Sequence, residues 1–135
     1  MAGVRGRAVT AQIATGTSAK TLLQLIAFEG VTSTDAPIQV RVLRQSTAGT
    51  MSSLTLVKHS DSDDETLQTT ALHTASAEPT AGDVLLTTLV HPQGGRLSLL
   101  LSQGREFVVK GGGRLGVEVT ASVSVDATVS VGFEE

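Results

Sequence analysis

The feature that most constrains the fold is a strict alternation of apolar and polar side chains over residues 115–133. Every second residue of this segment is apolar: Leu115, Val117, Val119, Ala121, Val123, Val125, Ala127, Val129, Val131 and Phe133. Successive side chains of a β-strand point to opposite faces, so this period of two predicts extended structure with one buried and one solvated face. A helix would spread the same valines around its whole circumference. The segment is therefore predicted to form two strands, joined by a hairpin turn near residues 122–126.

Further strands are predicted along most of the chain, because Thr, Ser, Gly and Val dominate and strong helix formers are sparse. The clearer candidates are residues 38–42, 54–56, 84–90 and 97–101, and the weaker ones are 8–14, 22–28, 68–75 and 107–109. Segment 84–90 is almost uniformly apolar, which predicts a strand buried on both faces. Turn-forming residues separate the candidates at 47–49, 60–64, 78–83, 91–95 and 111–113. About eight to ten short antiparallel strands at this spacing indicate an all-β sandwich or barrel.

The chain is expected to form one domain. Its 135 residues suffice to bury a core without a disulfide or metal staple. There is no cysteine, which excludes a disulfide framework, a Cys-ligated metal site and a thiol nucleophile. Residues 1–7 are rich in Gly and Arg and have no clear pattern. They are predicted to be a flexible N-terminal arm, or alternatively an arm that orders on a partner, with residues 8–135 as the β-sandwich domain.

Charge and aromatic content argue against nucleic acid as a partner. The net charge is −3, and charged residues make up 17% of the chain. Nucleic-acid binders carry clustered basic residues and stacking aromatics, whereas here aromatics are 2% and the basic residues are scattered. A weakly charged surface is typical of one that a partner covers. With no signal peptide and no apolar run near 20 residues, a cytoplasmically synthesised protein without membrane contact is expected.

Two glycine-containing segments resemble phosphate-binding motifs. Residues 111–116 match GxGxxG, but an alternating strand follows instead of the helix whose N-terminus would hold a pyrophosphate. These glycines are predicted to form a tight turn or a close backbone contact. Residues 14–21 faintly resemble a P-loop, yet Ala14 and Ala19 occupy the positions where glycine is needed. No cofactor site is expected.

Candidate metal and catalytic residues give little support for chemistry. His59, His73 and His91 lack the spacing that would place two ligands on one local face. The acidic residues of segment 61–65 have no EF-hand spacing and are interpreted as a solvated loop, although a cation would be sought there first. No GxSxG elbow is present, and the isolated carboxylates have no apolar enclosure. No catalytic and no metal-ligating residue is assigned.

Several segments resemble one protein family. They include Ala-Glu-Pro-Thr-Ala-Gly at 77–82 and the triple glycine at 111–113, and in full they are residues 27–37, 42–50, 73–85, 91–95, 104–109, 111–116 and 133–135. Over roughly residues 28–135 the chain resembles the small capsid decoration (cement) proteins of tailed bacteriophages. The first third, shorter and poor in aromatics, departs from that family's pattern. These segments are marks of a lineage and are not catalytic motifs.

The resemblance implies a jelly-roll sandwich, a homotrimer, and a place on the outer surface of the virion at threefold positions. The partner would be the major capsid protein, whose neighbouring subunits the trimer would clamp, and the protein would not be an enzyme. Exposure of the arm and of the loops at 78–83 and 91–95 adds candidate contact residues. These are Arg5, Arg7, Glu78, Pro79, Asp83, His91 and Pro92.

Other functions remain open at this point. A tail or head–tail component of a phage is the nearest alternative. A carbohydrate-binding or other ligand-binding jelly roll would normally use exposed aromatics, and the chain has no Trp or Tyr. An enzyme of the cupin type would need His and carboxylate ligands for a metal inside the barrel.

Overall fold

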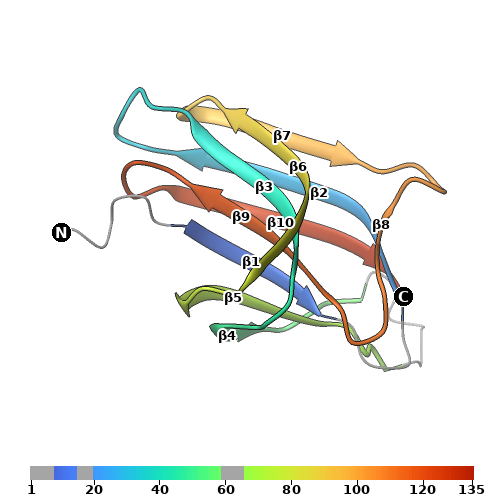
Figure 1. Ribbon diagram of the computed structural model, residues 1–135. Coiled ribbons are helices and arrows are strands. Elements are labelled where there is room, and N and C mark those ends of the chain that lie inside the picture. Colours follow the sequence, from blue (N-terminus) through green and yellow to red (C-terminus); the bar gives the residue numbers. More distant parts are fainter. Residues whose placement is uncertain (1–7, 15–19, 59–65) are drawn as a thin grey trace.

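The protein is an all-β structure. A computed structural model describes residues 8–14, 20–58 and 66–135, and these contain ten strands and no helix. Figure 1 shows the strands, which are β1 (Ala8–Ala14), β2 (Thr21–Val31), β3 (Ile38–Gln45), β4 (Thr50–Leu54), β5 (Thr70–Ala77), β6 (Ala81–Val90), β7 (Gln93–Leu100), β8 (Phe107–Val109), β9 (Arg114–Thr120) and β10 (Asp126–Glu134). Every pair is antiparallel. The predicted all-β fold is confirmed. The predicted arm at 1–7, residues 15–19, His59 and the acidic loop 61–65 lie outside the described residues.

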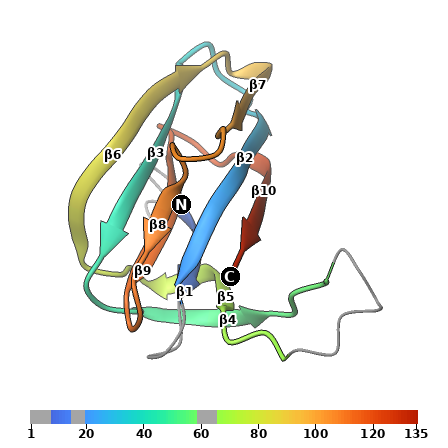
Figure 2. The same cartoon turned by 90° about the vertical axis from the view of Figure 1, so that its right-hand side faces the viewer.

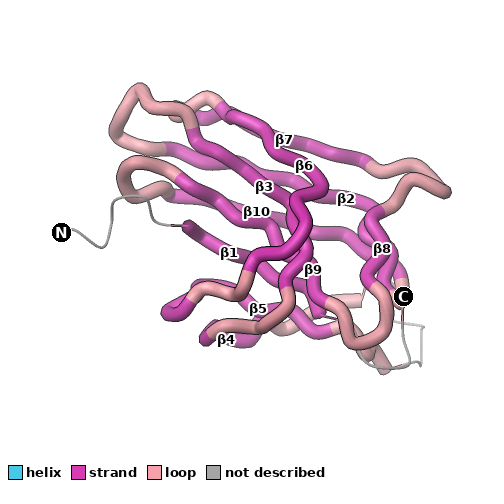
Figure 3. The backbone as a smooth tube through the Cα atoms, in the orientation of Figure 1, coloured by secondary structure: helices cyan, strands magenta, loops and turns pink. Residues whose placement is uncertain are grey.

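The strands form two sheets that face each other. One sheet has six strands in the order β4-β5-β1-β9-β3-β6, and the other has the order β10-β2-β7, with β8 also pairing with β2. Figure 2 shows the two layers from the side, and Figure 3 shows that the remaining described chain is loop. This arrangement is a β-sandwich. Its jelly-roll connectivity stays a prediction, since eight strands in two Greek keys define that fold.

The core lies between the sheets and follows the period of two, except that β2 shifts by one residue between Leu23 and Ile26. Strand β2 contributes Leu23, Ile26 and Phe28, each at most 1% exposed. The opposite sheet contributes the fully buried side chains of β3 and the apolar side chains of β9, namely Ile38, Val40, Val42, Leu115, Val117 and Val119. Burying a side chain of this kind stabilises the fold by about 1.5–3 kcal/mol before the entropy of ordering is counted. The apolar side chains of the alternating pattern are thus the ones that lie in the interior.

The predicted hairpin at 122–126 is wrong, although the predicted faces are right. Strand β9 pairs with β1 and β3 in the six-stranded sheet, whereas β10 pairs with β2 in the other sheet. The connection between them crosses from one layer to the other (Figure 1). Because both layers face the same core, the apolar side chains of β9 and β10 remain on one parity across the crossover. A hairpin and a crossover between facing sheets therefore produce the same sequence pattern.

The prediction that residues 84–90 are buried on both faces is also wrong. Strand β6 lies at the end of the six-stranded sheet, and within the described part of the chain it pairs only with β3. Most of its side chains are exposed, and only Val90 is buried. The strand predicted at 54–56 also needs a correction. Strand β4 ends at Leu54, so residues 55 and 56 lie outside it. Edge position, which no local pattern encodes, is the reason for the exposure of β6.

Candidate functional site

Of the predicted contact residues, Arg5 and Arg7 lie outside the described residues, and the other five lie near the two ends of β6. Glu78 and Pro79 precede the strand, and Asp83 is its third residue. His91 and Pro92 follow its last residue. Glu78, Asp83 and His91 are exposed, and Pro79 is half-buried. Pro92 is buried, which corrects its assignment as an exposed contact residue. At about 3.3 Å per residue, the ten-residue strand separates the two loops by roughly 30 Å.

The loop before β6 is held by a second loop. The amide of Ser46 donates to the carbonyl of Thr80 at 3.0 Å, and the amide of Thr80 donates to the Thr47 hydroxyl at 2.9 Å. Gly49 has φ +64° and a Cβ there would lie 2.8 Å from the Pro79 nitrogen, so only glycine allows this approach. Two of the segments that carry the family resemblance, 42–50 and 73–85, therefore pack against each other.

The loop after β6 is a tight turn. The amide of Thr32 donates to the Pro92 carbonyl at 2.8 Å, which ties the turn to the loop after β2. The amide of Gly95 donates to the His91 carbonyl at 3.1 Å, and the amide of Gln93 donates to His91 Nδ1 at 3.1 Å. A Cβ on Gly95 would lie 2.5 Å from the His91 nitrogen. Hydrogen bonding and close packing hold the exposed His91 at a defined place.

Between these loops, β6 exposes apolar side chains that the sequence reading placed in the interior. Leu89 is 64% exposed, Val84 45% and Leu85 36%. No charged residue occurs from residue 84 to residue 90. Natural edge strands usually carry charges or proline that discourage pairing with another chain. Thr87 and Thr88 interrupt the apolar run, but threonine is common in edge and central strands alike, so the sequence does not mark this surface.

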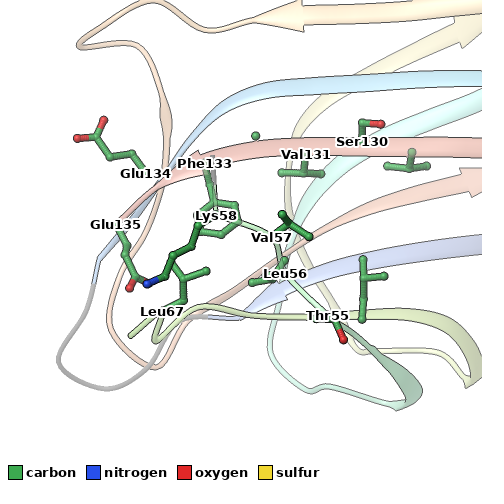
Figure 4. A pocket seen from close by; sticks show the side chains of 13 residues that line it. Thr55, Leu56, Val57, Lys58, Leu67, Ser130, Val131, Phe133, Glu134 and Glu135 are labelled. Carbon is green, nitrogen blue, oxygen red and sulfur yellow. The ribbon is translucent and has the colours of Figure 1, made fainter. Parts of the chain in front are cut away.

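A groove lies on the opposite side of the sandwich, where the free edge of β10 faces the chain after β4. It encloses about 530 Å³ and has the lining residues Leu54, Thr55, Leu56, Val57, Lys58, Leu67, Val129, Ser130, Val131, Gly132, Phe133, Glu134 and Glu135. Figure 4 shows the apolar side chains along the groove and the charged ones, Lys58, Glu134 and Glu135, gathered at one end. Phe133 is its only aromatic lining residue. The groove is apolar along its length and charged at one end.

Glu135, which follows β10, is hydrogen-bonded to the chain before β5. Its carboxylate accepts hydrogen bonds from the amides of Gln68 and Thr69, both at 2.9 Å, and from the Thr69 hydroxyl at 2.7 Å. Burial alone would raise the pKa of Glu135, but these hydrogen bonds and the positive charge of Lys58 outweigh it and hold the pKa below its usual value. The buried Thr69 hydroxyl also lies 2.8 Å from that of Thr21, so the contact reaches the start of β2.

The remaining polar groups form turns and ion pairs. In the described part of the chain, no three His, Cys, Asp or Glu side chains come together as a metal site requires. The predicted turn at 111–113 is confirmed, because the Gly113 amide donates to the Lys110 carbonyl at 2.8 Å and β9 begins at Arg114. On the outer face of the six-stranded sheet, Arg41 of β3 forms an ion pair with Glu118 of β9.

Comparisons with known proteins add no identification. No protein-family model matches the sequence, and neither a curated protein nor a solved structure matches it. Within residues 8–14, 20–58 and 66–135 there is no helix with the length and apolarity needed to cross a membrane. Function is therefore argued from the geometry and from the resemblance of the sequence segments.

Proposed function

We propose that this chain is a structural virion protein that decorates the outer surface of a tailed-bacteriophage capsid and stabilises the shell. In this proposal the partner is the major capsid protein, the protein acts as a homotrimer at threefold positions, and no reaction is catalysed. The oligomeric state and the location come from the family that the sequence resembles.

One observation carries the proposal: two exposed loops are held at opposite ends of one strand, roughly 30 Å apart by the rise of a β-strand. Both loops are fixed by hydrogen bonds to neighbouring chain. Such an arrangement suits contact with a large surface at two separate points. It suits a shell of repeated subunits, where each contact can be weak because several contacts of one assembly act together.

The test is binding to expanded shells made from the major capsid protein of the same phage. Wild-type protein is expected to co-sediment with the shells and to raise the temperature at which they leak. Glu78→Lys, a charge reversal in the exposed loop before β6, is expected to weaken binding. Glu29→Lys is the matched control, because Glu29 is exposed on the outer face of the other sheet.

Two results would overturn the proposal. One is the absence of the protein from purified phage particles, and the other is a failure of wild-type protein to co-sediment with expanded shells. Equal loss of binding in Glu78→Lys and Glu29→Lys would remove the loops as the contact site.

A further inference from the structure

Strand β6 has the properties of an edge that pairs with another strand. It is ten residues long, and among the described strands β3 is its only partner, which leaves its second edge free of them. The other free edges are protected by charge or by shortness. Arg96 lies in β7, Asp126 and Glu134 lie at the two ends of β10, and β4 has only five residues. On β6, a β-bulge opposite Val42 and Leu43 is the single protective feature between residues 84 and 90.

The register with β3 fixes which side chains of β6 face outward. Thr87 lies opposite Arg41, whose side chain reaches Glu118 on the outer face, and Leu89 lies opposite Gln39. Val90 lies opposite the fully buried Ile38. Thr87 and Leu89 therefore face outward, and Leu85, the residue at the bulge, is also exposed. These three residues are symmetric about Thr87.

We infer that β6 pairs with β6 of a second copy of this chain, antiparallel and around a twofold axis at Thr87. In this register Leu85 lies opposite Leu89 of the second copy, Thr87 opposite Thr87, and Val84 opposite Val90. Each outward leucine meets a leucine, and the two threonine hydroxyls can hydrogen-bond across the strands. No charge lies in the paired segment, so like charges do not oppose each other as they would for most self-paired strands.

This symmetry favours a second copy of the chain as the partner of β6. Around a twofold, the palindromic order places like side chains opposite each other at each outward position, whereas it gives no such match with an unrelated strand. The axis falls in the regular part of the strand, because the register with β3 is unbroken from Leu86 to Val90, and the bulge falls at Leu85, near one end of the paired segment. The inference does not depend on capsid binding. If the chain also assembles around a threefold, β6 pairs would link neighbouring trimers.

Disulfide trapping tests the register directly, because the full-length chain has no cysteine of its own. Oxidation of Thr87→Cys is expected to give covalent dimers on a non-reducing gel, since the two thiols would lie opposite each other. Leu85→Cys alone and Leu89→Cys alone are expected to stay monomeric. Their identical residues would lie about 13 Å apart along the strands, beyond the roughly 7 Å between Cα atoms that a disulfide can bridge. An equal mixture of these two variants is expected to cross-link.

Leu100→Cys is the matched control, because Leu100 is a leucine of β7 that is 79% exposed on the other sheet. The inference is overturned if Thr87→Cys cross-links no more than Leu100→Cys. It is also overturned if Leu85→Cys alone cross-links as readily as the mixture, which would indicate unspecific association.

Sedimentation of full-length protein gives an independent readout. Wild type and Leu100→Lys are expected to form assemblies of higher mass than Leu89→Lys at equal concentration, with twice its mass if the β6 pair is the sole contact between copies. Both lysines replace exposed side chains, so circular dichroism should show an unchanged fold. Equal masses for wild type and Leu89→Lys would contradict the pairing.

Discussion

Strands β9 and β6 belong to the same sheet, with β3 between them, and both contain several branched aliphatic residues. In β9, apolar side chains alternate with other residues, and Leu115, Val117 and Val119 are at most 2% exposed. In β6 the apolar residues are nearly continuous, yet only Val90 is buried. Strand β9 has a partner on each side, whereas β6 has β3 alone. Apolar density in a strand thus says less about burial than the number of neighbours that the strand has.

The largest effect should come from two Leu→Ala substitutions, one in each strand. Leu115→Ala in β9 removes a side chain that is 1% exposed, and the cavity left in the core should lower the free energy of unfolding by about 2–5 kcal/mol. Leu89→Ala in β6 should change it by less than about 0.5 kcal/mol, because that side chain is largely in solvent. Urea unfolding at a concentration where the chain is dissociated measures both. Equal losses would refute the contrast between the two strands.

A second contrast uses the glycines of the same strands. A Cβ at Gly116 of β9 would lie 2.6 Å from Cδ of Gln45, whose buried amide accepts a hydrogen bond from Gln12. Gly116→Ala should therefore destabilise the protein by about 1–3 kcal/mol through overpacking. For Gly82→Ala in β6 the nearest neighbour of the new Cβ is the Arg44 carbonyl oxygen, at 3.1 Å, and the change should cost under about 1 kcal/mol. Thermal melts of the two variants give the comparison, and a larger shift for Gly82→Ala would contradict it.

A third comparison is between a partly buried ion pair and an exposed one. Arg41 and Glu118 join β3 to β9, with side chains 31% and 16% exposed, whereas Arg96 and Glu29 on the other sheet are 74% and 53% exposed. Double-mutant cycles should give a coupling of about 1 kcal/mol for the first pair and close to zero for the second. The coupling should shrink in high salt. A stronger coupling for the exposed pair would show that burial does not govern these contacts.

The smallest effect should be the pH dependence from Glu135 beside β10. Its pKa is lowered in the folded protein, so the stability it contributes is present above the pKa of the unfolded chain. That stability is lost as the pH falls through the folded pKa, when the carboxylate that accepts from Thr69 becomes protonated. Glu135→Gln should flatten this part of the acid unfolding profile and leave the neutral part only slightly lower. An unchanged acid slope would exclude Glu135 as a contributor.

Much of the fold could be predicted from local patterns. The parity of residues 115–133 assigned the correct face to every apolar side chain for which burial in the core is observed. Glycine-rich turns were predicted correctly where the backbone demands glycine, as at Gly49 and Gly112, which both have positive φ. The exposed loops on either side of β6 were also found. That they lie at opposite ends of one strand, and that Pro92 is buried, could not be read from the sequence.

The sequence by itself determined that the chain is all-β, which residues turn, and which side of most strands meets the core. These properties are local, because backbone stereochemistry and the alternation of side chains act within a few residues. Only the tertiary structure decided that β9 and β10 belong to different sheets and that β6 is an edge. Pairing between strands is settled by contacts between distant parts of the chain, such as β3 with β6 and β9, and neighbouring residues carry no record of them.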